Sequence, residues 1–164
     1  MGRKLRKLNR AFLEAIVSNN KDDIRRLLKA GADVDARDEE HNEAAIILAA
    51  KFSDAEIVDL LLSAGAKIDA RDDQGRTALF LADVGSETFV RLLGAGADIH
   101  AVDNDGNTIL MRRVSQSASV NEVEELLLLG INPDAKNVDG ESACDLAISL
   151  GLVNVIKRLN VSAL

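Results

Sequence analysis

The chain of 164 residues repeats one short segment at nearly constant spacing. Residues 30–38 read Ala-Gly-Ala-Asp-Val-Asp-Ala-Arg-Asp; residues 64–72 and 95–103 are near copies, and residues 129–137 form a looser one. The second residue of each copy is a glycine, and these glycines are 34, 31 and 34 residues apart. Self-similarity at this period predicts an array of small units that bury their apolar faces against their neighbours.

Each unit combines helical stretches with a polar turn. Residues 54–62 place apolar side chains at helical spacing, and Gly65 follows where the end of a helix favours a left-handed residue. The next segment, 68–75, is too polar for a core and predicts a turn that projects as a finger. Thr77 then predicts the N-cap of another helix. The abundance of Ala and Leu, without Trp or Tyr, favours helices over strands.

A turn finger followed by two antiparallel helices resembles the ankyrin repeat. The family's helix-opening motif, Thr-Pro-Leu-His-x-Ala, corresponds to Thr-Ala-Leu-Phe-Leu-Ala at residues 77–82 and is weaker at 44–49, 108–113 and 142–147. The resemblance extends from about Leu5 to Leu159 and implies an all-α solenoid of stacked helix-turn-helix units with β-turn fingers.

The resemblance also implies a division of the chain. We expect a single ankyrin-repeat domain over residues 1–164, with an N-terminal capping half-repeat, three internal repeats and a C-terminal capping repeat. Their ranges are 1–36, then 37–71, 72–102 and 103–136, and finally 137–164.

The sequence departs from the family pattern at several points. The proline that opens the first helix is absent from every unit, the first finger has an extra residue around His41, and the 72–102 unit is about two residues short. Arg112 is expected to be exposed. Arg113 occupies a position that is Ala in the other units, so its head group either pairs with a glutamate of residues 122–125 or reaches a ligand; the ion pair is favoured.

By its resemblance to the family, the chain is expected to bind a partner protein through a concave face of finger tips and first helices; the alternative is that the tips are merely solvated. The candidate partner-binding residues are Arg37, Glu39, Glu40, Phe52, Arg71, Asp73, Gln74, Arg76, Val102, Asn104, Asp105, Asn107 and Gln116. Phe52 is the sharpest candidate, because aromatic side chains are favoured interface anchors. Its alternative place is beneath the lengthened first finger.

Charge divides the chain unevenly. The net charge is −7, yet the first ten residues carry five cations and no acid, so the remainder has a net charge of −12. An acidic body argues against broad phosphate-backbone binding, so no nucleic-acid partner is expected, and no membrane partner is expected either. The apolar side chains of the basic segment predict a cap over Ile24, Leu27 and Leu28, the alternative being a membrane-surface or nucleic-acid helix. An alternative function is an acidic decoy or inhibitor that occupies a basic or nucleic-acid-binding partner.

The residues needed for catalysis or metal binding are scarce. His41, His100 and Cys144 are the only imidazoles and thiol, no phosphate-cradling or nucleophile motif is present, and a calcium loop around Gly106 lacks its first and last carboxylates. Cys144 aligns with Leu79, which predicts a buried residue. We therefore expect a monomeric, cytoplasmic, non-enzymatic protein that holds no metal or cofactor and binds an unidentified protein partner.

Overall fold

The computed structural model describes residues 2–52 and 55–161, and the chain divides into two compact units, 1–98 and 99–164. Residues 53 and 54 lie outside the described residues, and residue 54 is the first of the segment 54–62 that is expected to be helical. Helices account for all the regular elements in the described part, with one isolated β-bridge between Arg37 and Ala44.

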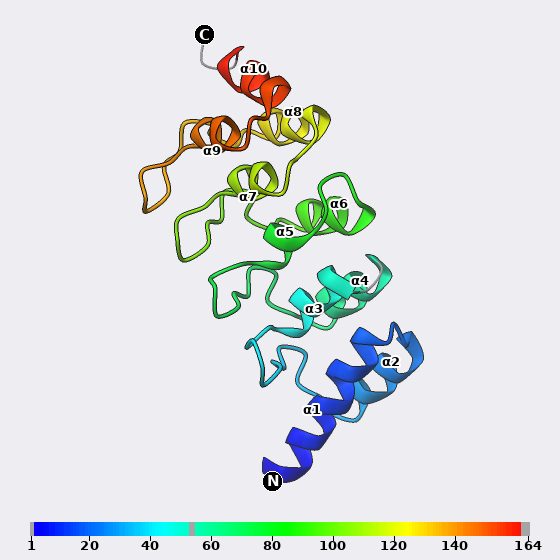
Figure 1. The fold of residues 1–164 in the computed structure, drawn as a ribbon. Coiled ribbons are helices and arrows are strands. Elements are labelled where there is room, and N and C mark those ends of the chain that lie inside the picture. The colour runs from blue at the N-terminus through cyan, green and yellow to red at the C-terminus, as the bar shows by residue number, and fades with distance from the viewer. Residues whose placement is uncertain (1, 53–54, 162–164) are drawn as a thin grey trace. The chain divides into compact units, whose positions relative to one another are not determined.

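The first unit contains three helix pairs, which are seen in the blue to green part of Figure 1. The pairs are α1 (Gly2–Val17) with α2 (Lys21–Lys29), α3 (Ala45–Phe52) with α4 (Ala55–Ser63), and α5 (Ala78–Leu81) with α6 (Glu87–Gly94). The first helices pack in succession, α1 on α3 and α3 on α5, while α4 packs on α6. This arrangement gives each repeat neighbours against which its apolar face is buried.

The second unit contains two helix pairs of the same kind. They are α7 (Ile109–Ser115) with α8 (Val120–Leu128) and α9 (Ala143–Ser149) with α10 (Val153–Val161). Again the first helices, α7 and α9, pack together, as do the second helices, α8 and α10. The same pattern in both units confirms the expected all-α repeat architecture.

The core follows the expected helical spacing. Phe12 and Ile16 of α1 are fully buried, α1 packs on α2, and Ile24 and Leu27 of α2 are buried as expected beneath a cap, although Leu28 is only half-buried. The start of α1 is different: every described residue from Gly2 to Lys7 is exposed. The cap therefore accounts for only the second part of this helix.

Local signals set the helix ends as predicted. Thr77 caps α5, its Oγ1 accepting a hydrogen bond from the Phe80 N–H at 3.2 Å. Gly65 has φ +90°, the left-handed conformation that glycine adopts without the steric cost of a side chain. Helix α5 has only four residues, because the 72–102 repeat is shorter than the others. A brief turn follows it, and Ser86 then caps α6.

Two burial expectations are wrong. Cys144 is half-buried, with its Sγ 3.3 Å from Asn160 Oδ1, whereas Leu79 and Leu110, with which it aligns, are fully buried. Arg112 is half-buried rather than exposed.

Candidate protein-binding surface

The fingers are built on one acceptor side chain at the base of each turn. The Asp72 carboxylate accepts from the N–H groups of Gln74 at 3.0 Å and Arg76 at 2.8 Å. Asp103 and Asn137 use their Oδ1 atoms in the same way, each accepting two backbone N–H groups from its own turn. These polar residues satisfy donors that no strand or helix satisfies, so their role is structural.

Several predicted binding residues hold the fingers of the first unit together. Arg37 donates through Nη1 to the carbonyl oxygens of Asn42 at 2.6 Å and Arg71 at 2.7 Å, which joins the first finger to the second. Arg71 in turn donates to the Gly75 carbonyl at 2.9 Å. Arg76 donates to Asp72 Oδ2 at 2.7 Å. The guanidinium groups of these three arginines are therefore committed to internal contacts.

Asp73 and Gln74 lie at the tip of the second finger. Asp73 Oδ1 accepts from Asn42 Nδ2 at 2.8 Å, a further link between the first two fingers. Gln74 is exposed, and its backbone N–H closes the turn. The side chain of Gln74 is thus available to a partner, whereas that of Asp73 is already engaged in part.

The second unit shows the same mixture of structural and exposed positions. Asn107 donates to Asp103 Oδ2 at 3.1 Å and accepts from Asn137 Nδ2 at 3.0 Å, so it joins two fingers. Gln116 Oε1 accepts from Arg113 Nη1 at 3.2 Å. The remaining predicted residues of this unit are exposed on the finger: they are Val102, Asn104 and Asp105.

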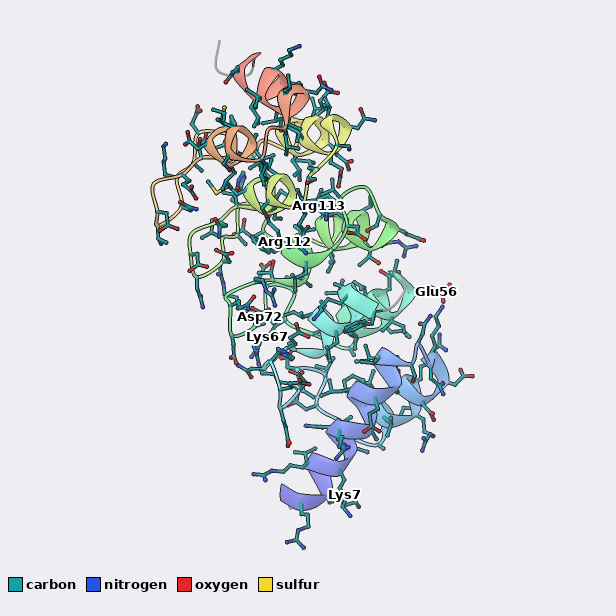
Figure 2. The ribbon with its side chains drawn as sticks, viewed as in Figure 1. Lys7, Glu56, Lys67, Asp72, Arg112 and Arg113 are labelled. Atoms are coloured by element: carbon teal, nitrogen blue, oxygen red, sulfur yellow. The ribbon has the colours of Figure 1, made fainter. Side chains whose placement is uncertain are left out.

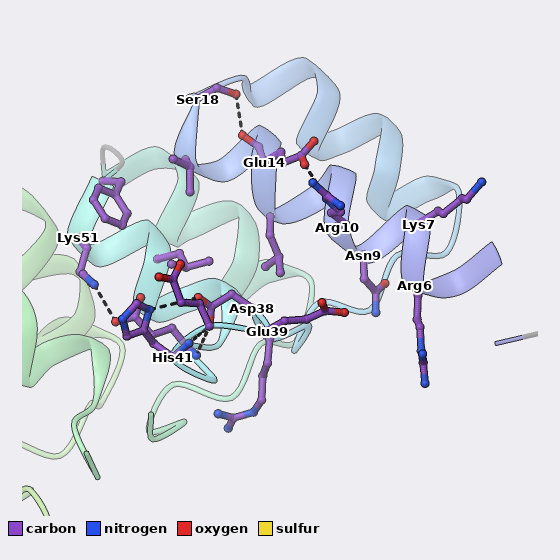
Figure 3. Close-up of a pocket in the computed structure, with 17 residues that line it drawn as sticks. Arg6, Lys7, Asn9, Arg10, Glu14, Ser18, Asp38, Glu39, His41 and Lys51 are labelled. Atoms are coloured by element: carbon purple, nitrogen blue, oxygen red, sulfur yellow. Dashed lines mark hydrogen bonds and ion pairs between the residues drawn. The ribbon is translucent and has the colours of Figure 1, made fainter. Parts of the chain in front are cut away.

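Four predicted residues of the first unit line one groove together with α1: they are Arg37, Glu39, Glu40 and Phe52. The groove has a volume of about 980 Å³ and runs between α1, the first finger and the end of α3. Figure 3 shows the finger residues lying across the groove from α1. Sequence reasoning missed the contribution of α1, although the regular spacing of its cations was a signal that this helix has a second exposed face.

Phe52 presents its ring to this groove. Its residue is 53% exposed, so it does not tuck beneath the first finger. Lys51 Nζ lies 5.1 Å from the ring centroid and donates to Glu43 Oε1 at 2.7 Å. Because the Glu43 side chain is only 3% exposed, this ion pair ties the last turn of α3 to the buried base of the finger. The aromatic ring is thereby presented from a fixed end of the helix.

The groove has walls of opposite charge. Helix α1 contributes Arg6, Lys7 and Arg10, of which Arg10 pairs with Glu14 at 3.0 Å. The first finger contributes the exposed acids Glu39 and Glu40. It also contributes Asp38, His41, Glu43 and Arg37 to the lining, and the Arg37 guanidinium is bonded to two carbonyl oxygens, so the acids predominate on this wall. Within residues 2–52 and 55–161, the side chains of Arg6, Lys7, Glu39 and Glu40 form no ion pair or hydrogen bond, so their charges are available to a partner.

Arg113 forms the expected internal ion pair. Its Nε lies 3.2 Å from Glu122 Oε1, and its Nη2 contacts the same oxygen. Burial acts to raise the pKa of Glu122, but hydrogen bonds from Arg113 and from Ser119 outweigh it and the pKa is lowered. Glu122 also completes the capping box of α8 by accepting from the Ser119 N–H at 2.9 Å. The arginine thus links α7 to the start of α8.

The described residues contain no group of three His, Cys, Asp or Glu side chains that could hold a metal ion. Within the same part of the chain, no helix has the length and apolar character needed to cross a membrane.

Comparison with known families places the chain. A family model described as ankyrin repeats, in three copies, matches residues 12–103. Since the match spans more than half of the sequence, the chain belongs to the ankyrin-repeat family, whose members are generally protein–protein interaction modules. No curated protein matches the chain. The finger built on Asn137 repeats the bonding of the finger built on Asp72, so the repeat pattern continues beyond the matched residues.

Proposed function

We propose that the chain is a non-enzymatic module that binds a partner protein through the groove of its first unit and through exposed finger tips. The observation that carries the proposal is Phe52, an exposed aromatic residue that lines a groove between side chains of opposite charge. Aromatic residues at the centre of an interface contribute a large share of binding energy, and surrounding polar residues exclude water from them. We also propose that the protein acts as a monomer in the cytoplasm.

The contacts between the fingers narrow the binding surface. Arg37, Arg71, Arg76 and Asn107 are assigned to holding the fingers, because their polar groups contact neighbouring turns. Among the other candidates, the following exposed residues are assigned to the partner: Glu39, Glu40, Phe52, Gln74, Val102, Asn104 and Asp105. The proposed binding surface therefore contains fewer residues than the set of candidates predicted from the sequence.

The test is comparative affinity capture. The full-length protein and its Phe52→Ala variant are used as baits in parallel, with Val90→Ala as the matched control, because Val90 is equally exposed but lies on α6 outside the groove. We expect one set of captured proteins to be lost with Phe52→Ala and kept with Val90→Ala. An identical set of proteins for both variants would contradict the proposed surface.

Salt dependence separates this proposal from an acidic decoy. A decoy that imitates a polyanion would lose affinity steeply as salt rises, because its attraction to the partner is electrostatic. Binding anchored on Phe52 would weaken only modestly over the same range. The affinity of the purified captured partner is therefore measured at low and at high salt.

A further inference from the structure

The two charged walls of the groove in the first unit belong to different elements, one to helix α1 and the other to the first finger. Arg6 and Lys7 belong to the exposed start of α1, where Lys7 projects from the helix end shown in Figure 2. Glu39 and Glu40 belong to the first finger, whose base is closed by Asp38 accepting from the Glu43 N–H at 2.6 Å. The helix and the closed turn therefore hold the cations and the acids apart.

Apolar side chains lie between these walls. Leu13, Val17 and Leu48 line the groove with Phe52, and Val17 is 49% exposed. Its volume of about 980 Å³ lies at the upper end of the roughly 300–1,000 Å³ typical of pockets for small molecules. A groove of this size with apolar lining residues has room for several side chains of a polypeptide.

We propose that this groove receives a polypeptide segment in which apolar side chains lie between an acidic stretch and a basic stretch, the acidic stretch against α1 and the basic stretch against the first finger. The inference rests on the proposed function and names the chemistry of its partner. Apolar contacts with Phe52 and Val17 supply affinity, and the separated charges set the orientation of the segment.

The walls also select against uniformly charged partners. A polyanion attracted to Arg6 and Lys7 also meets Glu39 and Glu40 in the lining of the same groove, and a polycation meets the reverse arrangement. Like-charge contacts of this kind discriminate between partners more strongly than exposed ion pairs raise affinity. Nucleic acid and anionic lipid are disfavoured on this ground.

The experiment measures fluorescence polarisation of two dye-labelled peptides of identical composition on the full-length protein. The divided peptide has a block of glutamates, a central Leu-Trp-Leu and a block of lysines; the alternating peptide mixes its glutamates and lysines on both sides of the same centre. We expect the divided peptide to bind about tenfold more tightly, the effect of two or more exposed ion pairs formed without opposing repulsion.

Charge reversals identify the walls. Arg6→Glu/Lys7→Glu and Glu39→Lys/Glu40→Lys should each remove the preference for the divided peptide, because both walls then carry one sign. Combining all four substitutions should restore the preference, since the peptide can lie in the reverse orientation. Arg25→Glu/Lys29→Glu on α2 makes the same charge change outside the groove and should leave the preference intact.

Two results would overturn the inference. One is equal binding of the divided and alternating peptides. The other is binding of duplex DNA or phosphatidylserine vesicles as tight as that of the divided peptide and lost with Arg6→Glu/Lys7→Glu, which would assign α1 to a polyanion. Neither result alters the capture experiment on Phe52→Ala, so failure of the charge pattern is distinguishable from failure of the proposed protein-binding role.

Discussion

At the scale of single residues, Asp145 shows how tightly a helix start can engage a carboxylate. Its Oδ2 accepts from the Ser142 Oγ at 2.7 Å, from the Ser142 N–H at 2.8 Å and from Lys136 Nζ at 3.1 Å. Hydrogen bonding by the Ser142 side chain is the largest cause, and together these contacts lower the pKa of Asp145 from 3.8 to about 2. The charged form is thus favoured in the folded chain.

Asp145→Asn should make the free energy of unfolding less dependent on pH in the acid range. Because the pKa is lowered on folding, the stabilisation is complete above the unfolded value and is lost as the pH falls from about 4 towards 2. We expect the free energy of unfolding of the wild type to decline through this window and that of Asp145→Asn to decline less. Urea denaturation followed by circular dichroism at several pH values measures the difference.

Ser142→Ala supplies the second arm of this prediction. It removes the hydroxyl donor that contributes most to the lowered pKa while leaving the carboxylate in place. Its pH profile should lie between those of the wild type and Asp145→Asn. A profile identical to that of the wild type would show that the capping box does not couple acid to folding.

The sequence predicted which residues stand on the fingers but not what each side chain does there. Arg37 and Glu39 are both charged and close in sequence, yet the former bonds two carbonyl oxygens and the latter faces solvent. Alignment of the repeats shows which residues lie on a finger. It does not show which contacts a side chain makes, because these depend on the distance from its polar end to the next turn. For Phe52 the sequence left two places open, an interface and the space beneath the first finger, and only the structure shows that the residue is exposed and lines the groove.

At the scale of elements, the fingers are held both within each turn and between turns. Asn137 serves both purposes: its Oδ1 accepts the N–H groups of Asp139 at 3.1 Å and Glu141 at 2.9 Å, and its Nδ2 donates to Asn107 at 3.0 Å. The Val138 N–H adds a bond to the Asp105 carbonyl at 2.8 Å. Two fingers of the second unit therefore support one another.

Substitution of Asn137 should separate these contributions. Asn137→Asp keeps the acceptor and loses the donor, so we expect a loss of about 1 kcal/mol in the free energy of unfolding, the net contribution of one hydrogen bond. Asn137→Ala loses both and leaves backbone N–H groups unsatisfied, with an expected loss of about 2 kcal/mol. Urea denaturation of both variants gives the comparison, and equal losses would mean that the acceptor contributes nothing.

Helix α1 shows how far periodicity predicts an element. Its apolar spacing indicated a cap, and Phe12 and Ile16 are buried accordingly. Leu5 follows the same spacing but is 46% exposed, because it belongs to the exposed start of α1, residues 2–7, which lies before the buried part of the helix. The period of a helix predicts which face is apolar, but the length of the covering neighbour decides how much of that face is buried.

At the scale of the whole molecule, the chain comprises two compact units, each built from paired helices. In repeat proteins stability is approximately a sum of local terms, because each repeat contacts only its neighbours. The expectation of one domain over residues 1–164 implies that the whole chain unfolds together. Amide protection measured along the sequence tests this, because separate units would lose protection separately.

Leu126→Ala provides that measurement. Leu126 of α8 is fully buried, and its truncation should cost about 3 kcal/mol through lost apolar contact and the cavity left behind. We expect hydrogen exchange to show lost amide protection within residues 99–161 and retained protection within 2–98. Leu61→Ala, equally buried in α4, should give the reverse pattern. Equal loss throughout would show that the chain unfolds as one cooperative domain.

The turns that close upon their own basal carboxylates have a consequence for protein engineering. Asp72 and Asp103 satisfy the backbone of their fingers without help from the outermost side chains, and Glu39 and Glu40 project beyond a turn closed in a similar way by Asp38. The outermost residues can therefore be randomised in a library while the basal residues are kept, and new recognition properties can be selected at little cost in folding. The chain thus offers a template in which one set of residues maintains the fold of the fingers and another set can be varied to change binding specificity.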